Sequence, residues 1–81
     1  MTEPLIKHLA SEQRFTLTLA DASAQLDYHV NGKVINFHHT FVPPAFRGKG
    51  LAEKLVRHAL QWAQTEGYDI QASCSYVQRF L

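Results

Sequence analysis

The sequence predicts an α+β fold, in which an antiparallel β-meander precedes a parallel β-α-β unit and one mixed sheet carries one main helix. Alternating apolar and polar residues recur across residues 14–42, as half-buried strands require. Residues 49–66 instead repeat apolar side chains at three- and four-residue spacing, which is the period of an amphipathic helix. Residues 69–76 alternate again after the helix, so this last strand should pair in parallel with the strand before the helix.

The meander has three expected strands, which cover residues 14–20, 24–30 and 33–42. Residues 21–23, Asp-Ala-Ser, can turn the chain between the first two strands. Asn31-Gly32 predicts the second hairpin, because both residue types tolerate a positive φ. Residues 1–12 show neither period, and no element is predicted there.

Proline and glycine mark the ends of the later elements. Pro43-Pro44 stops the third strand, because proline has no N–H to donate to a β-ladder. Gly67 is a natural stop for the helix. The last strand would then place four side chains on one face, namely Ile70, Ala72, Cys74 and Tyr76. Residues 77–81 are long enough for one helical turn only.

Length and composition restrict the classes of function. The chain of 81 residues suits one domain, residues 1–81. A net charge of +1 gives no basic stripe, so no nucleic-acid partner is expected. No apolar run reaches the length of a membrane span and residues 1–4 do not open a signal peptide, which predicts a cytoplasmic protein. Cys74 is the one cysteine, and it lacks the spacing to histidine that zinc sites use, so no metal is expected.

The segment with the clearest chemistry is residues 42–52, VPPAFRGKGLA, between strand and helix. Gly48 and Gly50 remove side chains where a ligand could approach the backbone. The first amides of the helix have no internal partner, and the helix dipole favours an anion beside them. Arg47 and Lys49 add positive charge, so a phosphate or pyrophosphate would fit. The alternative is a tight turn that uses glycine for geometry alone.

Arg47-x-x-Gly50-x-Ala52, placed after Val42-Pro43, resembles the acetyl-CoA signature Gln/Arg-x-x-Gly-x-Gly/Ala of the GNAT N-acetyltransferases. The stretches HTFVP at residues 39–43 and SCSY at residues 73–76 are similar to those of the minimal YjdJ-like acetyltransferases. The resemblance covers residues 24–81 and implies a compact GNAT-like core that moves an acetyl group from acetyl-CoA to a primary amine. It also implies a cofactor site in which Phe41 and Val42 pair with the pantetheine arm, while the pyrophosphate lies on Arg47, Gly48, Lys49, Gly50, Leu51 and Ala52.

Two departures from this family pattern leave alternatives open. Phe41 stands where relatives often carry Glu, which favours a module that binds CoA or acyl-CoA without turnover. A scaffold domain that has lost the ligand is a third class, against which the intact Arg47, Gly50 and Ala52 argue. Parts that shape the acceptor pocket of larger GNAT enzymes have no counterpart here, so the acceptor site should be open or completed by a partner. A small amine, a protein N-terminus and a lysine side chain all stay possible, and no oligomeric state is predicted.

Two residues are catalytic candidates. Cys74 would lie near the carboxyl end of the last strand, as a nucleophile or as an acid/base group, the alternative being a small core residue. His39, on the neighbouring strand, is of the residue type that most often serves as a general base near neutral pH, the alternative being a hydrogen-bonded core histidine. His38 should then point to the opposite face. We expect direct attack of the amine on acetyl-CoA, with Cys74 as acid/base partner, rather than ping-pong transfer through Cys74. Tyr76 and Phe80 could cover the pantetheine arm or cap the core, and capping is the expected role.

Overall fold

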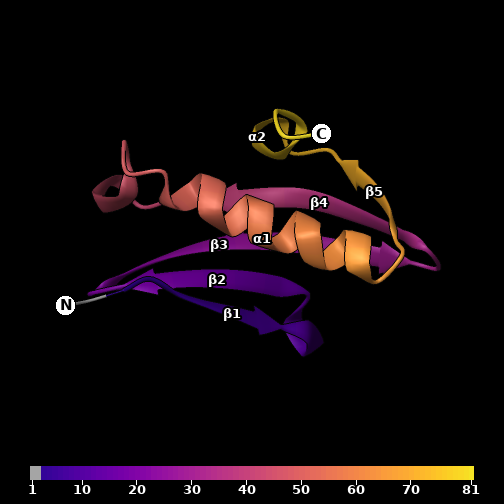
Figure 1. The fold of residues 1–81 in the computed structure, drawn as a ribbon, viewed down its shortest axis with the longest axis horizontal. Helices are drawn as coiled ribbons and strands as arrows, with labels where there is room; N and C mark the ends of the chain where they lie inside the picture. The colour runs from indigo at the N-terminus through magenta and orange to yellow at the C-terminus, as the bar shows by residue number, and fades with distance from the viewer. Residues whose placement is uncertain (1–2) are drawn as a thin grey trace.

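The structure is a computed structural model that describes residues 3–81, where one helix, α1, lies across one face of a mixed sheet (Figure 1). The strands are β1 (Leu5–Leu9), β2 (Arg14–Leu19), β3 (Ala22–Asn31), β4 (Val34–Phe41) and β5 (Asp69–Ala72). The helices are α1 (Leu51–Thr65) and α2 (Ser75–Gln78), with short 3-10 turns η1 (Ala10–Glu12) and η2 (Pro44–Phe46). The expected α+β fold with one main helix is confirmed.

The sheet keeps its strands in sequence order, from β1 to β5. The first four strands are antiparallel, and β5 pairs with β4 in parallel after the α1 crossover. The strand β1 was not expected, because its inward positions are Ile6 and His8 and a histidine there hides the apolar alternation. The described sheet therefore has five strands, one more than the sequence predicts.

Both hairpins of the meander differ from the prediction: the first is tighter and the second is shifted by one residue. Leu19 pairs with Ala22, so the first turn is Ala20-Asp21 and β3 begins inside the predicted turn. Ala20 has a φ of 55°, a conformation that glycine would adopt at lower cost. In the second hairpin Asn31 pairs with Val34, which moves the turn to Gly32-Lys33.

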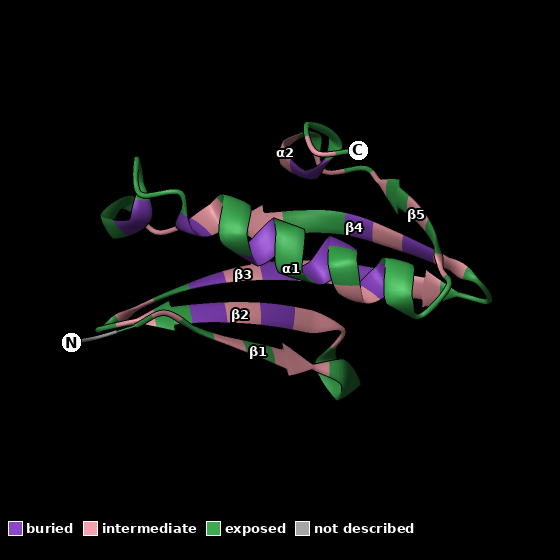
Figure 2. Ribbon diagram, in the orientation of Figure 1, coloured by how far each residue is buried: buried purple, intermediate pink, exposed green. Residues whose placement is uncertain are grey.

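The core lies between α1 and the sheet, where the buried side chains of both layers meet (Figure 2). The sheet contributes the fully buried Phe15, Leu17, Ala24, Leu26, Ile35 and Phe37, and the helix contributes Leu55, Val56, Ala59 and Ala63. Glycines bound the helix: Gly50 is its N-cap, and the amides of Gly67 and Tyr68 each bind a last-turn carbonyl at 3.0 Å. The predicted helix is confirmed, one or two residues shorter at each end.

His8 fills an inward position of β1 within an aromatic cluster. Its ring stacks on Phe15 at 4.0 Å between centroids and meets the edge of Trp62 at 4.4 Å. Its Nε2 lies 2.6 Å from the hydroxyl of Tyr28. Burial, and then the positive charge of nearby His58, lower the pKa of His8 below 6.5. The folded protein therefore prefers a neutral His8.

This preference predicts that the protein loses stability in mild acid. Because the pKa of His8 is lower in the folded state, the unfolded chain binds more protons below about pH 6.5, and the free energy of unfolding falls there as the pH falls. We expect the Tm at pH 5.5 to lie a few degrees below the Tm at pH 7.5. His8→Gln should reduce this difference, whereas His29→Gln, at an exposed position of β3, should keep it. An equal pH dependence in wild type and His8→Gln would contradict the account.

Candidate active site at the opening between β4 and β5

The two parallel strands separate halfway along β4. Their pairing runs from Val34–Asp69 to Phe37–Ala72, and a final bond joins the Cys74 amide to the Phe37 carbonyl at 3.2 Å. Beyond this point β4 continues to Phe41, while the chain after β5 turns into α2. The β4 edge at residues 38–41 thus lies free of a strand partner on the β5 side, at the carboxyl ends where α/β sheets bind ligands.

Where β5 ends, side-chain hydrogen bonds replace the backbone hydrogen bonds of the β-ladder. Asn36 accepts a hydrogen bond from the Ser73 amide at 3.0 Å and donates one to the Ser73 hydroxyl at 3.2 Å. The side-chain amide of Gln78, on α2, donates a hydrogen bond to the Ala72 carbonyl at 2.8 Å. The expected strand over residues 69–76 is therefore too long, and Cys74 lies at the N-cap of α2 instead of in a strand.

A β-bulge in β4 reverses the side-chain alternation next to the opening. Tyr28 pairs with Phe37 but Asp27 pairs with His39, which leaves His38 as the extra residue. His38 and His39 are both exposed, and Thr40 returns to the core face opposite Leu26. The expectation that His38 and His39 point to opposite faces, with His39 towards Cys74, is wrong for this reason. The alternation of apolar residues in the sequence does not predict this bulge.

Thr40 is the β4 residue that meets Cys74, with 3.4 Å between its hydroxyl and the sulfur. Cys74 is half-buried. Burial raises the pKa of the Cys74 thiol, but the hydrogen bond with Thr40 lowers it, and the backbone amides of Val77 and Tyr76 lower it further. The Cys74 side chain makes no capping hydrogen bond to α2. The net result is a pKa below its ordinary value, and therefore a larger thiolate fraction.

A groove of about 250 Å³ lies at the start of α1, next to Val42, which follows β4, and Tyr76, which lies on α2. Its lining residues are Val42, Phe46, Arg47, Gly48, Gly50, Ala52 and Tyr76. Five of them, all except Phe46 and Tyr76, were expected to contact a cofactor. Of the other three expected residues, Leu51 is buried, Phe41 is half-exposed, and Lys49 lines a neighbouring pocket.

The groove presents backbone amides and a positive charge to a ligand. Gly48 and Gly50 have φ values of 74° and 69°, which only glycine adopts without strain. The first helical hydrogen bond of α1 runs from the Lys54 amide to the Gly50 carbonyl, so the amides of the first turn have no helix partner. Glu53 in that turn pairs with Arg57 at 2.9 Å, which offsets its negative charge. An anion of the size of pyrophosphate fits this arrangement.

Tyr76, which was expected to cap the core, and Phe46, which the sequence did not single out, also line the groove. Tyr76 lies two residues after Cys74 on α2, and burial raises the pKa of its phenol, so Tyr76 keeps its proton near neutral pH. Phe46, the apolar residue of the polar turn, is buried beneath the groove. An aromatic residue directly before the charged, glycine-rich Arg47–Gly50 turn is the signal that could have identified Phe46.

Two further findings concern groups outside this groove. Among residues 3–81, no three His, Cys, Asp or Glu side chains converge as a metal site would require. No helix in this described part of the chain is long and apolar enough to cross a membrane.

Comparison with known proteins decides the family. The description of the GCN5-related N-acetyltransferase family matches residues 14–81. The chain belongs to this family. The bovine and human proteins NATD1 are 30% and 29% identical to it over 79 residues, and each alignment covers 94% of this chain and 70% of the relative.

Two solved structures place the GCN5-related fold on the same elements. The solution structure of a GCN5-like protein from Staphylococcus aureus has a TM-score of 0.72 and 29% identity, covering 94% of this chain and 76% of that one. An acetyltransferase from Trypanosoma brucei has a TM-score of 0.53 at 18% identity, covering 82% and 56%, and it supports the fold alone. Membership of the GCN5-related family supports an acyltransferase in general terms.

Proposed function

We propose that this chain transfers an acetyl group from acetyl-CoA to a primary amine. The single observation that carries the proposal is a groove that is lined by the amide-rich, positively charged turn at Arg47–Gly50, by Val42 just after β4, and by Tyr76, two residues after Cys74. A ligand that matches it needs an anionic end and a long, narrow arm that leads to a reactive carbonyl. Acetyl-CoA has these parts in this order.

The residues that would hold acetyl-CoA divide along the groove. Gly48, Gly50 and the first amides of α1, at Leu51 and Ala52, would bind the pyrophosphate, with Arg47 and Lys49 adding charge. The free edge of β4 at Phe41 and Val42 would pair with the amides of the pantetheine arm, as an added strand would. The half-exposed ring of Phe41 does not conflict with this role, because the pairing uses its backbone.

The chemistry then needs a proton acceptor and a proton donor. The amine nitrogen attacks the thioester carbon, the new C–N bond forms, and the C–S bond breaks to release the thiolate of CoA. Cys74, which contacts Thr40 at the end of β4, would give its thiol proton to that thiolate, since the two groups have similar acidity. His39 lies on the opposite face of the sheet, beside Asp27 in register. There it can accept the proton of an amine that enters from that open face.

A CoA-binding module without turnover is the second candidate. It is favoured by one observation: apart from Arg47 and Tyr76, no residue that lines the groove is ionisable, so no ordinary base faces it. Under this alternative the chain would bind CoA and acetyl-CoA equally well and would not release CoA in the presence of amines.

Turnover with a panel of amines distinguishes the two candidates. The purified chain is mixed with acetyl-CoA and small amines, peptide N-termini and lysine peptides, and CoA release and acetylated product are measured. We expect transfer to at least one class of amine, and a loss of at least about tenfold in the rate of His39→Ala with unchanged CoA affinity. His38→Ala, at the neighbouring bulge position, is the matched control and should keep the rate. No acetylated product across the panel would favour the binding module.

A further inference from the structure

The strand β1 is the outermost strand of the sheet, beside β2 (Figure 1). Only two of its side chains, Ile6 and His8, occupy inward positions, and both are half-buried. The family description matches the chain from residue 14 onward, so β1 precedes the matched part. The docking of β1 therefore depends on two inward side chains, one of which is ionisable.

His8 joins β1 to three other elements. Its ring stacks on Phe15 of β2, with 4.0 Å between the ring centroids, and meets the edge of Trp62 of α1 at 4.4 Å. Its Nε2 lies 2.6 Å from the hydroxyl of Tyr28 on β3. A second imidazole, that of His58 on α1, has its centroid 6.0 Å from the centroid of the same Phe15 ring. Two histidines from different elements thus lie against one phenyl ring.

The groups around His8 would not stabilise an imidazolium. Within residues 3–81, no carboxylate forms an ion pair or a hydrogen bond with His8. The titratable groups that face it are the phenol of Tyr28 and the imidazole of His58, and Tyr68 lies against Trp62. The charged side chains of the neighbouring strands and of η1 form pairs or lie on the outer face of the sheet, namely Lys7, Glu12, Arg14 and Asp27. A protonated His8 would therefore meet a second positive charge, that of His58, and no negative one.

We propose that His8 makes β1 an acid-released strand, which leaves the sheet in mild acid while β2–β5 and α1 stay folded. Burial, and then the charge of His58, lower the pKa of His8 while β1 is docked. After release the imidazole is in water and regains its ordinary affinity for protons. The released form therefore binds more protons below about pH 6.5, and acid shifts the equilibrium towards release. This inference does not depend on the proposed acetyl transfer.

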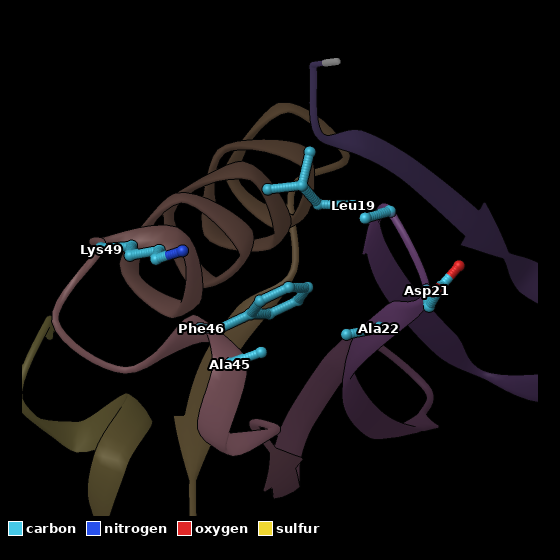
Figure 3. A pocket seen from close by; sticks show the side chains of 7 residues that line it. Leu19, Asp21, Ala22, Ala45, Phe46 and Lys49 are labelled. Carbon is cyan, nitrogen blue, oxygen red and sulfur yellow. The ribbon is translucent and has the colours of Figure 1, made fainter.

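The strand β2 has attachments of its own, which acid does not weaken. Phe15 and Leu17 are fully buried in the core that α1 covers. At the β2–β3 turn, Leu19 and Ala22 face the ring of Phe46 around a pocket of about 300 Å³ (Figure 3). These contacts are apolar and involve no proton, because they bury hydrocarbon surface. The opening therefore ends at β1, the strand whose docking includes an ionisable side chain.

Hydrogen exchange of single amides distinguishes release of β1 from unfolding of the whole domain. Protection factors are measured at pH 5.5 and 7.5, because they remove the intrinsic pH dependence of exchange. At pH 5.5 we expect at least about tenfold lower protection in the β1–β2 ladder than in the β3–β4 ladder, with little change in low urea, since little surface opens. At pH 7.5 the protection of the β1–β2 ladder should rise at least about threefold. Equal protection and equal urea dependence in both ladders would overturn the proposal.

Three histidine variants assign the pH dependence. His8→Gln can still bond the Tyr28 hydroxyl but does not titrate, so the β1–β2 ladder should be equally protected at both pH values. His58→Gln, at an exposed position of α1, keeps His8 and removes the second charge, so the difference between the two pH values should shrink. His29→Gln, at an exposed position of β3, is the matched control and should keep the wild-type difference. An unchanged difference in His8→Gln, or in His58→Gln should His8→Gln fail to fold, would overturn the role of His8.

Discussion

Gly50→Glu should abolish the rise in Tm that CoA gives the wild-type chain. CoA at a hundred times its Kd stabilises a protein by about 2.7 kcal/mol, which is about 10–20 °C of Tm for a domain of this size. Gly50 has a φ of 69°, and a Cβ added there would meet nothing within 4 Å. A glutamate would therefore project into open space at the phosphate end of the groove. Its carboxylate would repel the pyrophosphate and occupy part of its place.

Gly67→Glu is the matched control for this variant. Gly67 also has a positive φ, 81°, and also has open space around it, but it lies after the other end of α1. Both variants should lose about 1–2 kcal/mol of stability from the left-handed conformation. Only Gly50→Glu should lose the response to CoA. A full CoA response in Gly50→Glu would show that this turn does not hold the pyrophosphate.

Cys74 has the second large expected effect. Cys74→Ala should reduce the acetyl-transfer rate by about a hundredfold, as loss of a general acid does, with CoA affinity nearly unchanged. Incubation of the wild-type chain with acetyl-CoA and no amine should give no stoichiometric acetyl adduct by intact mass, because we expect direct attack of the amine. An adduct that is absent in Cys74→Ala and discharged by amine would establish ping-pong transfer instead.

The Thr40 contact supplies a readout of Cys74 that does not depend on turnover. Because the hydrogen bond with Thr40 lowers the pKa of the thiol, Thr40→Val should move the pH midpoint of Cys74 alkylation upward. Thr16→Val, on the outer face of β2, is the matched control and should leave that midpoint unchanged. Full transfer activity in both Cys74→Ala and Cys74→Ser would remove Cys74 from the mechanism and leave it a packing role.

The sequence predicted those parts of the fold whose pattern repeats. The β2–β4 meander alternates and α1 keeps its stripe, since each buries one face over several residues. β1 was missed because His8, a polar residue, occupies an inward position and hides the apolar alternation. In the fold, His8 contacts the Tyr28 hydroxyl and stacks on Phe15. β5 was predicted too long because the apolar alternation continues through Cys74 and Tyr76. The ladder ends earlier because the side chain of Asn36, 37 residues away, binds the Ser73 amide. Sequence neighbours cannot reveal such a contact.

The candidate site shows the same division between local and distant causes. Val42, Arg47, Gly48, Gly50 and Ala52 line the groove as expected, because a phosphate turn is a local feature with glycine and charge at fixed spacing. Cys74 contacts Thr40 instead of His39 because β4 contains one extra residue relative to β3. That extra residue is a feature of the pairing between the two strands. Tyr76 reaches the groove only because α2 follows β5 so closely.

Backbone amide shifts during a CoA titration would show whether CoA lies along the groove beside Arg47 and Val42, with its thioester near Cys74. We expect the largest shifts at the amides of Gly48, Gly50 and Ala52, with further shifts at Val42 and Cys74. In Gly50→Glu the same titration should move none of them. Shifts confined to other surfaces, such as the outer face of β1 and β2, or no shifts at CoA concentrations in the millimolar range, would contradict the account.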